Sequence, residues 1–419
     1  MCSIFGMYNA CGDPTTFEQE TFAQLRKNAM DRGRDGGRVE VYRANGTYAA
    51  LGNWRATPTP EVEKGNLQPY DGIVHNGTIA NAEELGLRPG EIDSEVLPRV
   101  LDRSSIARFK DTLRRIKGSF AIAAWSKEQA NVFLACNFKP IYVGRIDDCS
   151  TIFFSSMARH FNGLLGHWHA PVKMQPYSIL DLRTRVSYLL TPNDAPKRVL
   201  VICSAGLDSV TVATHYRNVL KWPTGLIHFQ YGCLAETKES ALIPRIAQRL
   251  SCDEYHIQPL PRELFGASSL FVDDGRPIAS GIQGAEYPYE WVNARNLVML
   301  SVATAYAEAH GYTHIALGNN LEEAGSYPDN EEEFTYLFNN LLPYATKPDV
   351  HVQVESPVGH LMKHEIVAYG LLHSAPYDLS WSCYRNGEKP CGRCGPCFMR
   401  NKAFARNGAK DPLTYEDEQ

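Results

Sequence analysis

The stretch RVLVICSAGLDS, residues 198–209, predicts a buried strand that runs through a loop of small residues into a helix. Small side chains let successive backbone N–H groups converge on an anion at the start of a helix. An aspartate in such a loop suits Mg²⁺, and serine hydroxyls suit phosphate oxygens. The sequence therefore predicts a phosphate-binding loop formed by Ser204, Ala205, Gly206, Asp208 and Ser209.

Strand-like and helix-like segments alternate after this loop, whereas short strand-like segments dominate before it. The segment TPNDAPK, residues 191–197, separates the two patterns and is rich in Pro, Asn and Asp, as linkers and turns are. The alternation predicts a doubly wound parallel sheet in a second domain, residues 198–412. The earlier pattern predicts a mostly β first domain, residues 2–190, with a helix near residues 17–28.

Four cysteines lie near the end of the chain in SCYRNGEKPCGRCGPCFMR, residues 382–400. A Cys-x-x-Cys turn delivers two thiolates from one tight turn, and four thiolates give Zn²⁺ a closed tetrahedron. Gly392 and Gly395 permit the backbone conformation that such turns need. The pattern favours a structural zinc knuckle over a pair of disulfides or an iron–sulfur cluster. The predicted ligands are Cys383, Cys391, Cys394 and Cys397.

The first domain begins with a candidate nucleophile. Cys2 follows the initiator methionine, whose removal would leave an α-amine suited to act as general base for the thiol. Asn76 and Gly77, expected in a turn after a strand, offer an amide and a backbone N–H for an oxyanion hole. Arg55 suits a carboxylate, and Asp93 suits an ammonium group. Together these groups describe a site that hydrolyses glutamine.

Several segments of the first domain occur in the order MCSIFG, GNWRAT, QPYDGIVHNGTIAN, IDSEVL and KGSFAIAAW. In this order they resemble the class II glutamine amidotransferase domain, the N-terminal-nucleophile fold of asparagine synthetase and glucosamine-phosphate synthase. The resemblance covers about residues 2–185 and implies an αββα sandwich. It also implies the roles of nucleophile for Cys2, oxyanion hole for Asn76 and Gly77, and glutamine ligands for Arg55 and Asp93.

The loop SAGLDS resembles the SGGxDS loop of ATP pyrophosphatases, which implies ATP and Mg²⁺ as cofactors. Segments such as FQYGCLAETKES, IALGNN, GSYPDN and the cysteine run resemble QueC, the 7-cyano-7-deazaguanine synthase, over about residues 198–412. In place of the family patterns VPGRN and YGQRH the chain has VNARN and YGCLA, and Asn330 stands where the family often has Cys. These departures lie where the base is expected and leave its identity open. The implied substrate contacts are Arg295, Asn296, Tyr327 and Asp329.

Fusion of a glutaminase to a QueC-like domain implies that nitrogen from glutamine reaches a 7-deazaguanine at an ATP-using site. We expect conversion of 7-cyano-7-deazaguanine to the 7-formamidino, archaeosine-type base for nucleic-acid modification, because the fusion resembles archaeosine-forming enzymes. The alternative is glutamine-dependent conversion of 7-carboxy- to 7-cyano-7-deazaguanine, which the nearly intact loop favours. Further alternatives are an asparagine synthetase-like amidotransferase and a non-catalytic protein that binds a modified base.

The composition is that of a globular enzyme, with 419 residues, 44% hydrophobic and 21% charged. There is no apolar run of about 18 residues, so no membrane span is expected. Eleven cysteines and a start without signal-peptide features indicate the cytoplasm, or the host cytoplasm if the protein is viral. The net charge of −5 disfavours an extensive nucleic-acid interface. Direct nucleic-acid binding and homodimer formation stay open, and the implied partners are glutamine, ATP and a 7-deazaguanine base.

Overall fold

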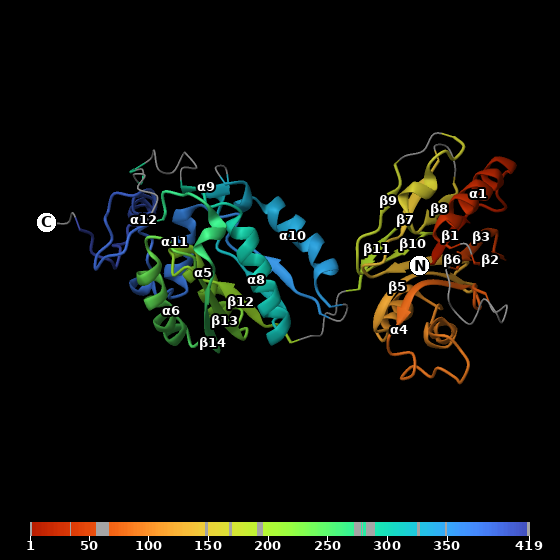
Figure 1. Cartoon of the computed structure of the whole chain (residues 1–419), viewed down its shortest axis with the longest axis horizontal. Helices are drawn as coiled ribbons and strands as arrows, with labels where there is room; N and C mark the ends of the chain where they lie inside the picture. The colour runs from red at the N-terminus through yellow and green to blue at the C-terminus, as the bar shows by residue number, and fades with distance from the viewer. Residues whose placement is uncertain are drawn as a thin grey trace. The chain divides into compact units, whose positions relative to one another are not determined.

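The computed structural model divides into two compact units, Met1–Asp194 with Lys347–Asp349, and Ala195–Thr346 with Val350–Gln419. Each unit is described by itself (Figure 1). Met1 and most of the segment between the predicted domains lie outside the described residues. The described residues are 2–33, 35–55, 67–146, 150–166, 170–190, 196–271, 278, 280–281, 290–324, 327–347 and 350–416.

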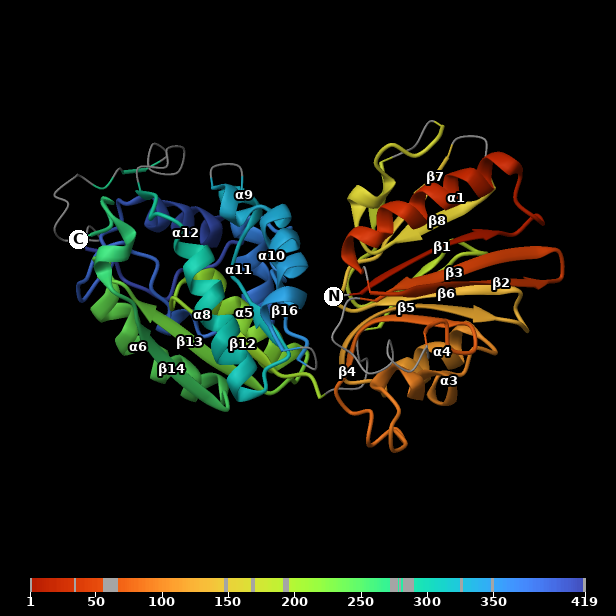
Figure 2. The ribbon, with the colours of Figure 1, turned by 45° about the vertical axis from the view of Figure 1, so that its right-hand side comes forward.

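The first unit contains two stacked antiparallel sheets with helices on their outer faces (Figure 2). The first sheet has the order β2–β3–β1–β8–β7–β9, and its strands are β1 (Ser3–Asn9), β2 (Gly37–Ala44), β3 (Thr47–Trp54), β7 (Tyr142–Arg145), β8 (Ile152–Ser155) and β9 (Val172–Lys173). The second sheet has the order β11–β10–β6–β5–β4, and its strands are β4 (Ile73–Ile79), β5 (Gly118–Ser126), β6 (Asn131–Cys136), β10 (Ser178–Asp181) and β11 (Ser187–Leu189). The helices are α1 (Thr16–Asn28), α3 (Leu97–Val100) and α4 (Ile106–Leu113).

Alternating side chains join these layers, because neighbouring residues of a strand point to opposite faces of its sheet. In β5, Ala121 and Ala123 pack between the sheets, whereas Ile122 packs outward against the cluster that contains Phe109 of α4. On the opposite side, Leu25 of α1 joins the apolar cluster of the first sheet. The resulting αββα sandwich confirms the predicted fold of this half, and α1 confirms the helix expected near residues 17–28.

The second unit is built on one parallel sheet of order β14–β13–β12–β15–β16. The strands are β12 (Val199–Ile202), β13 (Thr224–Gln230), β14 (Glu254–Pro259), β15 (His314–Ala316) and β16 (Gln353–Glu355). The chain builds outward from β12 to β14 and then returns to the other side of β12 with β15. The strand order therefore reverses between β12 and β15, which is where open α/β sheets bind ligands beyond the carboxyl ends of their strands.

Helices cover both faces of this sheet (Figure 2). Val199 and Val201 point into one apolar cluster together with α5, α6, α11 and α12, while Leu200 points into the opposite cluster with α8 and α10. The helices are α5 (Leu207–Thr214), α6 (Glu236–Leu250), α8 (Arg295–His310), α9 (Leu321–Ala324), α10 (Glu332–Ala345), α11 (Lys363–Leu372) and α12 (Gly395–Arg406). The predicted doubly wound sheet is confirmed. The helix expected after the phosphate loop is divided, because α5 continues as a π-helix, His215–Val219.

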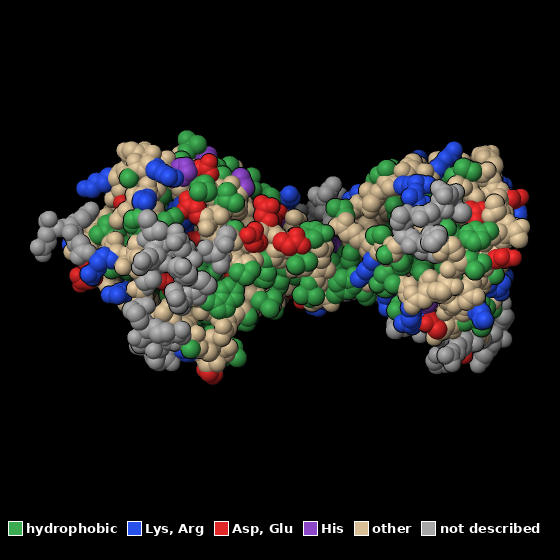
Figure 3. Space-filling model, turned by 90° about the horizontal axis from the view of Figure 1, so that it is seen from above, with side chains coloured by type: hydrophobic (Ala, Val, Ile, Leu, Met, Phe, Trp, Pro, Cys, Tyr) green, Lys and Arg blue, Asp and Glu red, His purple; other side chains and the backbone are tan. Residues whose placement is uncertain are grey.

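The surface carries charges of both signs. On the face shown in Figure 3, acidic and basic side chains are interspersed over both units. This mixture agrees with a formal net charge of only −5. Among the described residues, every helix is too short or too polar to cross a bilayer.

Candidate active sites

The predicted phosphate loop lies at the point where the strand order of the second unit reverses. It leaves β12 and enters α5, and Gly206 is the residue that precedes the first turn of that helix. Ser204 Oγ accepts a hydrogen bond from the backbone N–H of Gly206 (3.2 Å) and lies 3.4 Å from Ser209 Oγ. Ala205 is buried and has a φ of 60°, a left-handed conformation that glycine adopts without strain. The loop thus holds the conformation expected for anion binding even though alanine replaces glycine.

A buried lysine fixes the aspartate of this loop. Lys363 Nζ donates to Asp208 Oδ2 (2.5 Å) and to Glu323 Oε1 (3.0 Å), and the Lys363 side chain is only 12% exposed. Burial alone would lower the pKa of Lys363, but the two carboxylates outweigh this effect and raise it above its usual range. Asp208 Oδ1 is buried without a hydrogen-bond partner among the described residues. That oxygen is suited to a cation such as Mg²⁺.

A cavity of about 270 Å³ opens over the loop. Its walls come from segments that follow three neighbouring parallel strands: the phosphate loop after β12, Tyr231 and Cys233 after β13, and Asn319 after β15. Of the predicted substrate residues, Arg295 and Asn296 at the start of α8 line this cavity. The structure therefore brings the predicted ATP loop and two predicted substrate contacts into one cavity.

A second cavity, of about 110 Å³, adjoins the first and shares Arg295, Glu323 and Lys363 with it. Tyr327, another predicted substrate contact, lines this second cavity. Asp329 lines neither cavity, although its charge acts on Arg295 and its backbone carbonyl accepts from Asn319 Nδ2 (3.2 Å). Its neighbour Asn330 lines both cavities.

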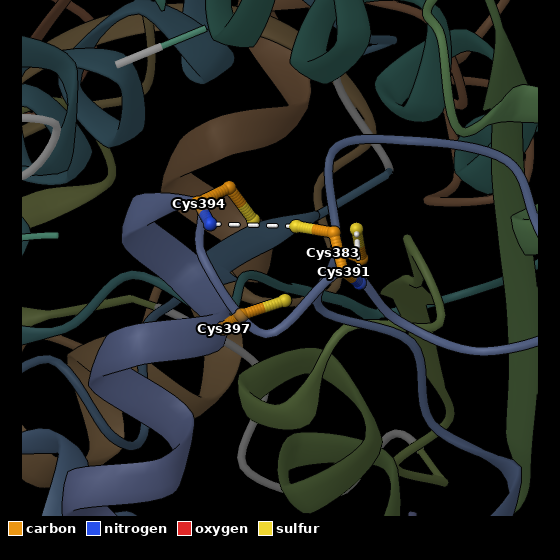
Figure 4. A group of neighbouring side chains, drawn as sticks. All are labelled: Cys383, Cys391, Cys394 and Cys397. Atoms are coloured by element: carbon orange, nitrogen blue, oxygen red, sulfur yellow. Dashed lines mark hydrogen bonds between the residues drawn. The ribbon is translucent and has the colours of Figure 1, made fainter. Parts of the chain in front are cut away.

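The four predicted metal ligands converge at the start of α12 (Figure 4). All four residues are at most 3% exposed, and their sulfur atoms lie within 4.8 Å of one another. Tetrahedral Zn–S bonds of about 2.3 Å imply S···S distances of about 3.8 Å, so a small contraction suffices to coordinate one ion. The backbone N–H of Cys394 donates to Cys391 Sγ (3.4 Å), as in a knuckle that stabilises thiolates. The four cysteines form no disulfide. They are a closed set of soft donors for a structural metal.

In the first unit, Cys2 directly precedes β1, and Asn76 and Gly77 belong to β4. The expectation of a turn after a strand is wrong here, because Asn76 and Gly77 pair with Ala121 and Phe120 of β5. Gly77 is required by close approach, since a Cβ there would lie 1.9 Å from the carbonyl oxygen of Ser119. Asn76 is 4% exposed, and its Nδ2 is buried without a hydrogen-bond partner among the described residues. Asn76 thus gives β4, a strand that contacts β1, an unpaired buried donor. Such a donor is what an oxyanion hole requires.

The two residues predicted to bind glutamine, Arg55 and Asp93, both act on His75 of β4. Asp93 accepts from the backbone N–H of Ile79 through Oδ2 (2.7 Å), which orients its carboxylate. Arg55 follows β3 and is buried. The pKa of His75 is lowered to about 4, chiefly because the ring is buried. The charge of Asp93 raises this pKa, and the charge of Arg55 lowers it. The neutral His75 is held by Ser94 Oγ (2.8 Å from Nδ1), so the two charges act on a fixed, uncharged ring.

Comparison with known proteins decides the family. A family model described as "Queuosine biosynthesis protein QueC" matches residues 198–408, and one described as "Glutamine amidotransferase domain" matches residues 64–162. Over its whole length the chain is 40% identical to all of "7-cyano-7-deazaguanine synthase 2" of Sulfurisphaera tokodaii. The chain belongs to the QueC family.

Other QueC relatives differ in extent. The "7-cyano-7-deazaguanine synthase" of Saccharolobus solfataricus is 38% identical, with 100% of both chains covered. The protein of the same name from Methanothrix thermoacetophila is also 38% identical, but it matches 52% of this chain and 99% of itself. QueC relatives thus occur with and without the additional half. The predicted family is confirmed, as is the prediction of an enzyme that uses glutamine and ATP.

The sequence reasoning missed Lys363 and Glu323, although both lie in or beside the segments that resemble QueC. One signal was present: Lys363 is the first residue of a helix, where the helix dipole disfavours a cation. A basic residue in that position indicates a partner elsewhere in the fold whose attraction outweighs the repulsion by the helix dipole. Its partner Asp208 is 155 residues away, and sequence spacing does not indicate that pairing.

We expect Lys363→Met to abolish ATP-dependent synthesis and to lower the free energy of unfolding by about 3 kcal/mol, because the Asp208 carboxylate would stay buried without its cation. Lys363→Arg should restore part of both properties. Product formation in the presence of Mg-ATP and denaturant unfolding measure the two effects, with exposed Lys402→Met as the control. A Lys363→Met enzyme with normal product formation would contradict the assigned role.

We expect Cys394→Ser to release the bound metal and to destabilise the second unit, because a hydroxyl replaces a thiolate in a closed site that contributes folding free energy. Metal analysis of the wild-type protein should find about one ion per chain, and thermal unfolding should show the loss of stability in the variant. Exposed Cys11→Ser is the matched control. A variant of full stability that lacks only turnover would contradict a structural role.

Proposed function

We propose that this enzyme releases ammonia from glutamine in its first unit and adds the nitrogen to a 7-deazaguanine in its second unit. We further propose 7-cyano-7-deazaguanine as the acceptor and the 7-formamidino base as the product. The observation that carries this proposal is a phosphate loop whose cavity adjoins a second cavity, with Arg295 and Lys363 shared by both. A nucleotide and a small planar acceptor would therefore lie side by side.

The first unit supplies nitrogen in this proposal. The Cys2 thiolate attacks the amide carbon of glutamine, and the resulting oxyanion accepts hydrogen bonds from Asn76 Nδ2 and the Gly77 N–H. Arg55 holds the α-carboxylate of glutamine, and Asp93 holds its ammonium group. The buried, unpaired Asn76 amide supports this assignment.

The second unit holds ATP in this proposal. Backbone N–H groups of the loop and the hydroxyls of Ser204 and Ser209 would contact phosphate oxygens, and Asp208 would hold Mg²⁺. When bound, Mg²⁺ neutralises phosphate charge. We propose Zn²⁺ as the metal of the four-cysteine site, since buried thiolates with no open position suit that ion.

Two residues of the cavity over the loop favour the nitrile as acceptor. Cys233 and Ala235 stand where the family pattern YGQRH has Gln and His, and both line this cavity. Their side chains offer a carboxylate fewer partners than Gln and His would, which favours a neutral nitrile, and Arg295 and Lys363 are the cations of the same wall. Ammonia then adds across the C≡N bond, which forms one C–N bond and leaves a C=N–H group.

Conversion of 7-carboxy- to 7-cyano-7-deazaguanine is the second candidate. The full-length relatives are named for the nitrile product, and the conformation of the phosphate loop is suited to adenylation. In that reaction the carboxylate would be adenylated, amidated and dehydrated, with release of AMP and pyrophosphate.

Mass spectrometry of products distinguishes the two candidates. Wild-type enzyme would be incubated with amide-¹⁵N glutamine and with either the 7-cyano or the 7-carboxy base, with and without Mg-ATP. We expect ¹⁵N-formamidine from the nitrile. A ¹⁵N-nitrile formed only from the carboxy base, together with AMP, would establish the second candidate. The absence of ¹⁵N in any product would contradict both.

We expect Cys2→Ala to reduce glutamine-dependent synthesis by about 10³-fold, because the nucleophile that releases nitrogen is lost. Synthesis from ammonium chloride should stay within about threefold of wild type, since that source bypasses the first unit. Glutamate release and product formation measure the two activities, with Cys11→Ala as the control. Equal loss of both activities in a folded variant would show that nitrogen release and synthesis are not separate.

A further inference from the structure

Glu290 is a buried carboxylate without a partner. It is 3% exposed, and neither of its side-chain oxygens forms a hydrogen bond with any described residue. It lies just before α8 and lines the 110 Å³ cavity. Burying an unpaired carboxylate costs stability, so this side chain is suited to a ligand that supplies donors.

The surroundings of Glu290 suit a planar ligand. Leu270, Pro396 and Met399 form apolar parts of the cavity wall, and the Tyr327 ring lines it. Trp291 lies nearly parallel to Tyr327, with an interplanar angle of 8° and ring centroids 6.2 Å apart. Burial and the charge of Glu290 together raise the pKa of Tyr327 to about 12, and both residues line the same cavity. The apolar side chains and the Tyr327 ring of this wall suit the face of a flat heterocycle.

The position of the cavity indicates which ligand it takes. It shares Arg295, Glu323 and Lys363 with the cavity over the phosphate loop, so its occupant would lie against the nucleotide. A guanine-type base presents an N–H and an amino group on adjacent atoms of one edge, and one carboxylate accepts from both donors. An adenine-type base presents an acceptor on the corresponding edge, which a carboxylate repels.

We propose that Glu290 binds the N1–H and 2-amino group of the acceptor base through its two carboxylate oxygens, and so selects 2-amino-4-oxo heterocycles. This proposal rests on the proposed function, because it places the 7-deazaguanine in the 110 Å³ cavity. It assigns Glu290 as a specificity-determining residue that acts on the edge of the base opposite to the reacting 7-substituent.

Binding would be measured calorimetrically with 7-cyano-7-deazaguanine and with its analogue that lacks the 2-amino group. Wild type should prefer the 2-amino base by about tenfold or more, because the analogue leaves a buried oxygen unpaired. In Glu290→Gln, affinity for the 2-amino base should fall by about tenfold, and the preference should shrink to about threefold or less. Exposed Glu333→Gln of α10 is the matched control and should behave as wild type.

Thermal unfolding separates ligand recognition from a structural role. Without a base, Glu290→Gln should unfold at the same temperature as wild type or a higher one, since an unpaired buried charge is removed. A lower unfolding temperature would indicate that Glu290 has an internal partner and would overturn the proposal. A stabilising effect of Mg²⁺ alone that disappears in Glu290→Gln would assign the carboxylate to a cation and would also overturn it.

The two proposals fail in different ways. If wild type forms labelled product but Glu290→Gln retains wild-type KM and preference, only the role of Glu290 is wrong. If wild type binds the 2-amino base selectively yet forms no labelled product, the proposed reaction is wrong and the recognition stands. If wild type binds neither base, both are wrong.

Discussion

One buried ammonium group fixes the geometry of the ATP-using half. Lys363 at the start of α11 binds Asp208 at the start of α5 and Glu323 in α9. These helices follow β16, β12 and β15, three neighbouring parallel strands whose carboxyl ends meet at one edge of the sheet. Without that cation, two carboxylates would face each other where phosphate groups are expected. The ion pair therefore offsets the negative charge of the carboxylates where the proposed anionic nucleotide would bind.

Both units keep buried polar atoms unpaired at the places where ligands are expected. Asn76 offers an amide donor, Asp208 an oxygen for a cation, and Glu290 two oxygens for N–H donors. Each atom costs stability in the free protein, and each matches the opposite polarity of its proposed ligand. This agreement adds to the shape of the two cavities as support for ligand sites.

Much of the fold and part of the sites could be predicted from the sequence. Apolar runs indicated the sheets of both units, and the cysteine spacing indicated the four-sulfur cluster, because both signals are local. The pair Asn76–Gly77 was misread as a turn, since Asn-Gly is typical of turns. Pairing with β5 prevails there, and glycine is needed for the approach of Ser119. The ion pair of Lys363 and the burial of Glu290 depend on contacts between distant segments, which no local pattern encodes.

Cys233 and Ala235, which differ from the family pattern YGQRH, and Glu290 have complementary effects in the proposed function. Cys233 and Ala235 remove polar groups from the cavity wall, whereas Glu290 provides an acceptor pair in the adjoining cavity. Contacts to the remote edge of the base would thereby supply more of the binding free energy, and contacts to the reacting 7-substituent would supply less. The 7-substituent changes from a neutral nitrile to a cationic formamidine during the proposed reaction. Contacts to the remote edge of the base stay the same through this change, so they favour neither substrate nor product. Cys233 and Ala235 offer a carboxylate fewer partners than the Gln and His of the family pattern would, so these substitutions agree with nitrile chemistry.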